Sequence, residues 1–188
     1  MMQLGANPPD HRRACGRGLR SAGRSALLEA VVPITLGPRM VTFRRDVLGW
    51  AGASHFVLEP LTDDTDDAPA VFAALRCTDT VQLRGGQVVP GPVFLVAPPG
   101  LFAPGYQVAL DERFAESLDL IVPDDAALLA IVTQRNPLER STVNLFSPIV
   151  VNRHTGMADQ FVPASSEAEV GWLVRTPLPS SLVTEDRD

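Results

Sequence analysis

Short apolar runs separated by turn-forming residues dominate residues 141–162. Thr142 to Phe146 and Ile149 to Asn152 are two such runs, and after an Asn- and Gly-containing turn a third run ends at Phe161-Val162. Runs of about five residues bounded by Pro, Asn and Gly are typical of consecutive strands of an antiparallel sheet. Because Pro148 has no N–H group to donate, it must lie at a bulge or at the start of a strand.

The same pattern of short apolar runs continues upstream. A hairpin is predicted around Gly85-Gly86, since Gly accepts the positive φ of a tight turn. One helix is predicted at Leu110 to Leu118, where Phe114 and Leu118 are four residues apart and acidic residues stand at the start. Further strands are predicted at Val31 to Leu36, Met40 to Phe43, His55 to Leu58, Ala70 to Cys77, Val93 to Val96 and Leu128 to Val132.

This density of strands predicts an all-β fold. Apolar runs too short for helices, with one or two short helices between them, favour a single antiparallel β-barrel or roll-like domain. We assign residues 31–178 to this domain. Residues 179–188 are expected to form a flexible acidic C-terminal tail.

The first thirty residues differ from the rest in composition. They contain five Arg among many Gly, Ser and Pro residues, and their longest apolar stretch is Ala26-Leu27-Leu28. So little apolar surface predicts a disordered, Arg-rich extension whose removal leaves stability nearly unchanged. A transit peptide is a second interpretation of an Arg- and Ser-rich, acid-poor N-terminus. RNA binding is a third, although the segment has no aromatic residue to stack on a base.

Composition narrows the functional class. The chain has 188 residues and a hydrophobic fraction of 45%, which fits a globular domain with a substantial core. It contains no apolar run of the roughly 18–20 residues that a membrane span needs. Cys15 and Cys77 form no CxxC motif, which agrees with a reducing, cytoplasmic location. All 16 basic residues are Arg, and the absence of Lys excludes a Walker-type phosphate loop and Schiff-base chemistry.

The charge of the predicted domain indicates the kind of partner. Residues 31–188 contain 11 Arg against 20 acidic residues. Such an acidic domain should repel nucleic acid and suit a basic protein partner. The alternative interpretation is that the acidity only keeps the protein in solution.

Catalytic and metal-binding patterns are weak. Gly52 to His55 begins like a nucleophile elbow, but Phe56 stands where the second Gly should be. The cluster from Asp63 to Asp67 lacks the central Gly and terminal Glu of a calcium loop. Asp124-Asp125 follows a Pro, which indicates a helix start or turn rather than an acid/base pair. The sequence therefore predicts no enzyme, no cofactor and no metal site.

A family resemblance is carried by the segment from Asn144 to Asn152. Its sequence, Asn-Leu-Phe-Ser-Pro-Ile-Val-Val-Asn, resembles the signature of the flagellar assembly factor FliW family. Val41 to Leu61 is similar to the opening stretch of the family's sequence pattern, and Val93 to Tyr106 is similar to its middle stretch. Val174 to Leu178 resembles its closing stretch. The chain departs from the family pattern by having Trp50 in place of Phe, Thr176 in place of His, and a longer segment at Thr80 to Pro92.

The resemblance implies a cytoplasmic switch between two protein partners. Members of the family bind newly made flagellin and the RNA-binding translational repressor CsrA, and the two partners compete. When flagellin has been exported, the freed factor captures CsrA and flagellin translation resumes. Such a switch needs no catalysis, only linked binding equilibria.

The resembling segment also supplies candidate contacts with a partner, on the expectation that it forms a sheet edge beside a Pro-marked bulge. The alternative is that Phe146 and Ile149 belong to the core and that Asn152 caps a turn. The candidate protein-binding residues are Asn144, Phe146, Pro148, Ile149 and Asn152.

Two other functions remain open from the sequence. A small-molecule-binding or enzymatic β-barrel would have a deep pocket with convergent polar groups and perturbed pKa values. A nucleic-acid-binding barrel would need a basic face with aromatic residues, which the acidic composition argues against.

Overall fold

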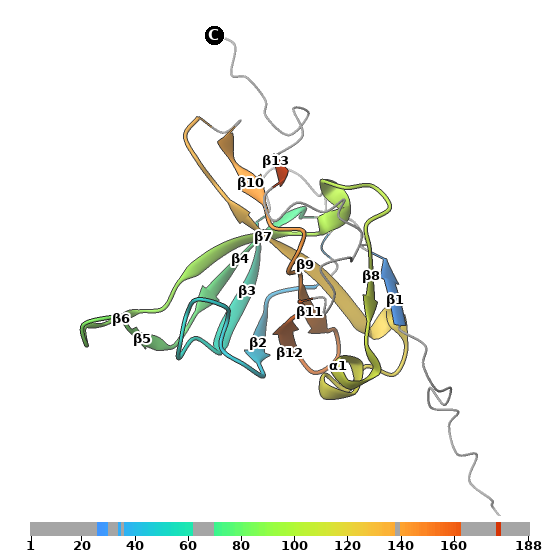
Figure 1. Cartoon of the computed structure of the whole chain (residues 1–188), viewed down its shortest axis with the longest axis horizontal. Coiled ribbons are helices and arrows are strands. Elements are labelled where there is room, and N and C mark those ends of the chain that lie inside the picture. The colour runs from blue at the N-terminus through green and yellow to red at the C-terminus, as the bar shows by residue number, and fades with distance from the viewer. Residues whose placement is uncertain are drawn as a thin grey trace, which may run out of the picture.

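Seven strands close into a β-barrel (Figure 1). The computed structural model describes residues 26–29, 34, 36–61, 70–137, 140–162 and 176–177. The strands follow one another around the barrel in the order β11, β12, β2, β3, β4, β7 and β9, and β9 pairs back onto β11. Their bounds are β2 Arg39–Phe43, β3 His55–Leu61, β4 Phe72–Cys77, β7 Val93–Ala97, β9 Ala126–Thr133, β11 Ile149–Asn152 and β12 Met157–Gln160.

The remaining elements decorate this barrel. β8 runs alongside β1, β5 pairs with β6 in a separate hairpin, and β10 extends the sheet from β9 to β13. Within the described ranges, no helix is long and apolar enough to cross a membrane. The bounds are β1 Ala26–Glu29, β5 Thr80–Gln82, β6 Val88–Pro90, β8 Gln107–Leu110, β10 Thr142–Val143, β13 Thr176–Pro177, α1 Glu112–Ser117, and the 3₁₀ helices η1 Pro99–Leu101 and η2 Pro123–Asp125.

The pairing is antiparallel except between β12 and β2, where Met157 lies opposite Thr42 in a parallel register. The predicted all-β, predominantly antiparallel barrel is therefore confirmed. Several predicted elements also match. β11 begins directly after Pro148, the hairpin turns at Gly85 and Gly86 with φ of 113° and 87°, and Asp111 caps α1 by accepting a hydrogen bond from the Phe114 N–H.

Some element boundaries differ from the prediction. The strand expected at Thr142 to Phe146 ends at Val143, because the Asn144 side chain accepts hydrogen bonds from the Phe146 and Ser147 N–H groups and turns the chain. Ile34 is buried but lies in no strand, and most of the strand expected at Val31 to Leu36 falls outside the described residues. The Asp63 to Asp67 loop and the C-terminal tail also lie outside them.

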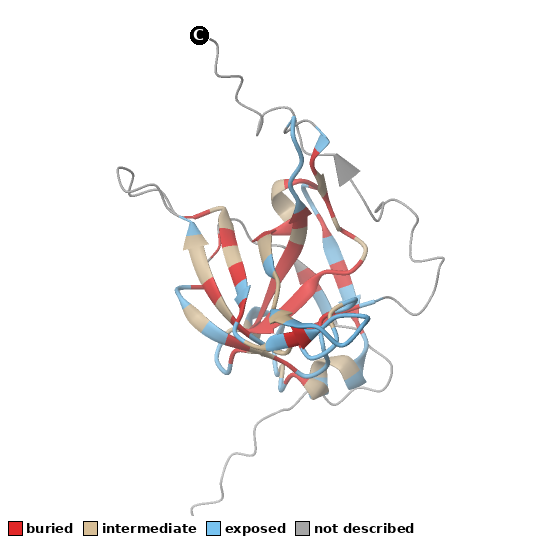
Figure 2. Cartoon of the chain, turned by 90° about the vertical axis from the view of Figure 1, so that its left-hand side faces the viewer, coloured by how far each residue is buried: buried red, intermediate tan, exposed pale blue. Residues whose placement is uncertain are grey.

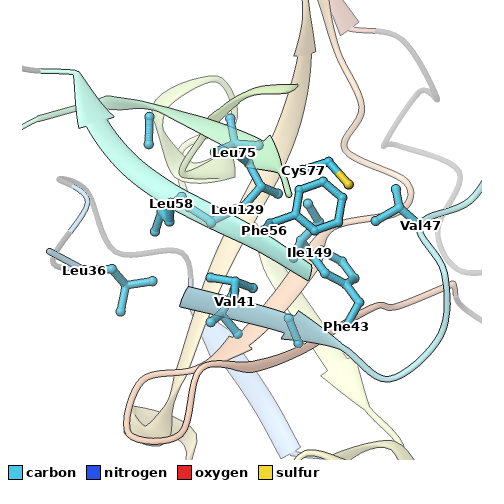
Figure 3. Packing of buried hydrophobic residues seen from close by; sticks show 14 of the residues in the cluster. Leu36, Val41, Phe43, Val47, Phe56, Leu58, Leu75, Cys77, Leu129 and Ile149 are labelled. Carbon is cyan, nitrogen blue, oxygen red and sulfur yellow. The ribbon is translucent and has the colours of Figure 1, made fainter. Parts of the chain in front are cut away.

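Two apolar clusters form the core. The inner cluster fills the barrel, where Val41, Phe56, Leu58, Leu75 and Ile149 converge from four strands (Figure 3). Along β2, β4 and the first half of β3, buried side chains alternate with half-buried or exposed ones, and the buried set points into this cluster (Figure 2).

The outer cluster packs on the outside of the barrel, under β8 and α1. It is built around Tyr106, Leu110, Leu118, Leu128 and Val150. Tyr106 is 2% exposed, and its hydroxyl donates a 2.6 Å hydrogen bond to the Leu145 carbonyl oxygen. Burial raises the pKa of Tyr106 well above its ordinary value. β9 lies between the two clusters and contributes side chains to each.

The extension predicted for residues 1–30 is corrected at its C-terminal end. Ala26–Glu29 form strand β1, which pairs antiparallel with β8 (Figure 1). Leu28 is 2% exposed in the outer cluster, whereas Leu27 on the opposite face is 52% exposed. The sequence contained only three adjacent apolar residues here, and the free edge of β8 is what gives one of them a place to be buried. Residues 1–25 and 30 lie outside the described residues.

Leu28→Ala should therefore destabilise the protein. Removing a buried Leu side chain costs about 2–5 kcal/mol of unfolding free energy, through lost burial and the cavity left behind. Leu27→Ala is the matched control and should change the free energy of unfolding by less than about 0.5 kcal/mol. Urea denaturation monitored by circular dichroism measures both, and equal effects of the two variants would contradict the docking of β1.

Gly156 holds the turn between β11 and β12 against β2. Its φ is +76°, and a Cβ at this position would lie 2.5 Å from the Met40 carbonyl oxygen. The Thr42 N–H donates a 3.0 Å hydrogen bond to the Gly156 carbonyl oxygen, which fixes the close approach. A side chain is therefore excluded by both the backbone conformation and the space.

Gly156→Ala should lower the free energy of unfolding by about 1–3 kcal/mol, since the strain of a positive φ adds to the clash with Met40. Gly37→Ala is the control, because Gly37 has no positive φ and no atom within 4 Å of the added Cβ. Thermal unfolding of both variants measures the difference. A Gly156→Ala melting temperature equal to that of the control would refute the close approach.

Candidate functional site

A cleft of about 470 Å³ opens at one end of the barrel. It lies between the loop that follows β2, helix α1 and the end of β12, which are close together at the lower end of the molecule (Figure 1). Charged and apolar side chains share its surface. The lining residues are Arg44, Arg45, Asp46, Leu48, Asp111, Arg113, Phe114, Ser117, Asp159, Gln160, Phe161 and Val162.

Hydrogen bonds fix the first wall of the cleft, the loop after β2, to β12. The Arg44 N–H donates to the Ala158 carbonyl oxygen at 2.9 Å, and the Leu48 N–H donates to Oε1 of Gln160, also at 2.9 Å. Nε of Arg45 donates to Oδ2 of Asp159 at 2.8 Å, and Asp159 is only 5% exposed. A buried carboxylate is costly unless it is paired, so Arg45 both compensates Asp159 and holds the loop in place.

Helix α1 forms the opposite wall. The Phe114 ring packs edge-on against Phe161, with 5.0 Å between the ring centroids, so the helix is anchored to the segment after β12. Nδ2 of Asn152 donates to the carbonyl oxygens of Leu118 and Asp119 at 2.8 and 3.2 Å, which satisfies carbonyl groups at the end of the helix. The walls are therefore held in place by the barrel itself.

The residues predicted to contact a partner do not line this cleft. Pro148, Ile149 and Asn152 are buried, with Ile149 0% and Asn152 2% exposed. The expectation of a free edge is wrong for β11, because this strand pairs with β12 on one side and β9 on the other. Asn144 and Phe146 are half-buried. They remain candidate contacts, whereas the other three serve the fold.

Asn152 shows that part of the Asn144 to Asn152 pattern has a structural role. Its Oδ1 accepts hydrogen bonds from the His154 and Thr155 N–H groups, in addition to the two bonds donated by its Nδ2. The side chain thus uses its hydrogen-bonding capacity to join the turn after β11 to the end of α1. The carbonyl oxygen of Pro148 likewise accepts the Phe161 N–H at 3.0 Å, behind the cleft.

Ser54, His55 and Asp79 lie together, which the sequence did not predict. Nδ1 of His55 is 3.1 Å from both the Ser54 Oγ and the Asp79 Oδ1. In a Ser-His-Asp triad the two partners lie on opposite ring nitrogens, so this cluster cannot relay a proton from Ser to His in that way. Asp79 instead accepts the N–H groups of Ser54 and His55 at 2.9 and 2.8 Å, and so fixes the start of β3.

Asp124 and Asp125 lie in the short 3₁₀ helix η2, which agrees with the predicted helix start or turn. Asp125 Oδ2 accepts the N–H groups of Ile121 and Val122 at 2.9 Å, and its Oδ1 lies 2.9 Å from Nε2 of His154. The hydrogen bonds from Val122 and Ile121 lower the pKa of the Asp125 carboxyl group. Among the described residues, no group of three or more His, Cys, Asp and Glu side chains is arranged to hold a metal ion.

The residues that do line the cleft were missed by the sequence analysis. Arg44, Arg45 and Asp46 directly follow a predicted strand, and this charged tripeptide was the available signal. Asp159 gave less indication of its role, because its partner Arg45 is 114 residues away in the chain. Only the parallel pairing of β12 with β2 brings the two together.

Asp79 should make stability depend on pH. Partial burial raises the pKa of its carboxyl group, but hydrogen bonds from the His55 and Ser54 N–H groups outweigh this and lower the pKa below its ordinary value. A lowered pKa stabilises the folded state above the unfolded pKa of about 4, and that stability is lost as the pH falls through the folded pKa.

Asp79→Asn keeps an oxygen acceptor and removes the charge. The melting temperature of the variant should lie below that of the unmodified protein at pH 7, and the difference should shrink as the pH falls from about 5 to about 2. Melting curves across this range measure the effect. A difference that stays constant with pH would show that the charge of Asp79 contributes nothing to stability.

Comparison with known proteins agrees with this fold. The family model described as "FliW protein" matches residues 34–173. The flagellar assembly factor FliW of Bacillus licheniformis is 33% identical over 138 residues, which are 73% of this chain and 84% of that protein. The flagellar assembly factor FliW of Bacillus subtilis (strain 168) is 33% identical over 124 residues, 66% of this chain and 77% of that protein. A crystal structure of the flagellar assembly factor FliW matches with a TM-score of 0.58 and 25% identity, and covers 74% of this chain and 86% of that chain.

The family match includes the strands of the barrel and every residue that lines the cleft. The resemblance noted at Asn144 to Asn152 is thereby confirmed over most of the chain. This protein belongs to the flagellar assembly factor FliW family.

Proposed function

We propose that this flagellar assembly factor acts in the cytoplasm as a switch between two protein partners and catalyses no reaction. The partners are newly made flagellin and a CsrA-type RNA-binding regulator of translation, each of which excludes the other. Membership of the FliW family is the observation that carries this proposal. The cleft supports it, because it combines fixed walls with charged and apolar side chains.

The switch works through competition for a limited amount of the factor. While flagellin accumulates, it occupies the factor, and the regulator is free to repress flagellin translation. When flagellin leaves the cell, the factor is released and captures the regulator, so translation resumes. Each partner lowers the apparent affinity of the other, and linkage requires the two effects to be equal.

The charge of the domain favours a basic partner. Residues 31–188 have 11 Arg against 20 acidic residues, and an RNA-binding regulator needs positive charge to contact phosphate. Opposite charges increase the association rate, an effect that salt screens, whereas apolar contacts set the lifetime of the complex. Asn144 and Phe146 are proposed contacts, since their side chains are half-buried and retain surface for a partner.

Binding assays with purified proteins test this proposal. The full chain should bind flagellin monomers and the CsrA-type regulator of the same host at low salt. Addition of excess flagellin should release the bound regulator, and excess regulator should release bound flagellin. Size-exclusion chromatography of the three-component mixture measures the exclusion. Recovery of neither complex, or a stable ternary complex, would refute the proposed switch.

A further inference from the structure

We propose that the cleft between the loop after β2 and helix α1 receives an acidic segment of flagellin that carries an apolar side chain. The inference rests on the proposed function and assigns one of its two partners to a defined surface. It follows from which charged side chains of the cleft are already paired within the fold, and from which of its apolar side chains are exposed.

The three carboxylates of the cleft are engaged within the fold. Oδ2 of Asp46 accepts the Gly52 N–H at 2.8 Å, and Oδ1 of Asp111 accepts the Phe114 N–H at the same distance. Asp159 is buried and paired with Arg45 at 2.8 Å. Only Asp159 is neutralised by a cation, whereas Asp46 and Asp111 are exposed and keep their charge while each accepts one backbone N–H group of the fold.

Two of the three arginines are available to a partner. Arg44 and Arg113 are exposed, and neither guanidinium group has an ion pair or hydrogen bond among the described residues. They come from opposite walls of the cleft, one from the loop after β2 and one from α1. A guanidinium group binds a carboxylate in a two-pronged, charge-assisted geometry, so the pair is suited to an acidic segment lying between the walls.

Apolar surface lies beside these charges. Leu48 is 60% exposed and Val162 is 47% exposed, and both line the cleft. The edge-to-face pair of Phe114 and Phe161 supplies an aromatic surface at the same place. Exposed large apolar side chains next to fixed aromatic rings favour burial of an apolar group from a partner. The volume of about 470 Å³ is within the range of pockets that enclose a small group of side-chain atoms.

Chemistry distinguishes between the two proposed partners. An RNA-binding regulator presents basic surface, which Arg44 and Arg113 would repel, whereas the acidic remainder of the domain would attract it. Flagellin does not bind RNA in this proposal and therefore needs no basic surface. We assign the acidic segment to flagellin for this reason. The partners can still exclude each other from separate surfaces, since negative coupling between two sites has the same effect as overlap.

Charge reversal of the two free arginines is the first test. The full-length variant Arg44→Glu/Arg113→Glu is compared with Arg84→Glu/Arg135→Glu, which makes the same change in net charge at exposed positions outside the cleft. Titration calorimetry measures the affinity for flagellin monomers and for the CsrA-type regulator. The cleft variant should bind flagellin at least about tenfold more weakly and less salt-dependently, while its affinity for the regulator is retained. The control should bind flagellin as the unmodified protein does.

A second pair of variants tests the apolar contact. Leu48→Ser removes an exposed apolar group from the cleft, and Ile121→Ser removes one that is 65% exposed elsewhere. The Leu48 variant should dissociate from surface-immobilised flagellin several-fold faster than the unmodified protein does. The Ile121 variant should dissociate at the same rate as the unmodified protein. The melting temperature of each variant establishes that it is folded.

The outcomes separate this inference from the proposed function. If the unmodified protein binds both partners but the cleft and control charge variants bind flagellin equally, the cleft assignment is overturned and the switch stands. If the cleft variant instead loses only the regulator, the acidic occupant is likewise overturned. If the unmodified protein binds neither partner, the proposed function fails and the inference fails with it.

Discussion

The burial of β9 between two apolar clusters is the constraint on which the rest of the structure depends. Ala127 and Leu129 face into the barrel, whereas Leu128 and Ala130 face the outer cluster under β8 and α1. Antiparallel strands commonly have one solvent-exposed face, but this strand is apolar on both faces. Because β9 also pairs with β7 and β11, it closes the barrel and provides the surface on which α1 and β8 pack. The position of the cleft therefore follows from the core.

The polar side chains inside this apolar frame are few, and they hold the cleft in shape. Asp159 pairs with Arg45, Gln160 accepts the Leu48 N–H, and Asn152 bonds to carbonyl groups at the end of α1. Leaving a buried polar group without a hydrogen-bond partner costs more free energy than the net gain from a typical hydrogen bond. Any other position of the contacted segment would leave such a group unpaired, so each of these residues holds its segment in place. The loop after β2 and the helix are thereby fixed relative to each other by side chains from β11 and β12.

The distribution of charge gives the domain two kinds of surface. The domain as a whole is acidic, yet the cleft has two arginines whose charges are not paired within the described part of the chain. The net charge governs long-range attraction, whereas the local arrangement governs which groups fit at contact distance. A protein that binds two partners in turn can attract one through its net negative charge and bind the other through the local arrangement of arginines in the cleft.

The sequence alone determined the class of fold and the family. Short apolar runs, the Gly85-Gly86 turn and the Asp111 cap are local signals, since period-two burial, positive φ and helix capping each depend on neighbouring residues. Asn144 to Asn152 indicated the family correctly, but the binding edge predicted from the same residues lies mostly in the interior, because β11 pairs with a strand on each side.

Only the tertiary structure decided which residues meet. Leu28 is buried because β8 offers it an edge, and Arg45 meets Asp159 because β12 runs parallel to β2. Each of these contacts joins residues more than 70 positions apart, and nothing in the local sequence encodes the partner at such a separation. Local patterns fix the type of an element, whereas tertiary packing fixes the neighbours of its side chains, and the cleft forms where that packing brings the loop after β2, α1 and the end of β12 together.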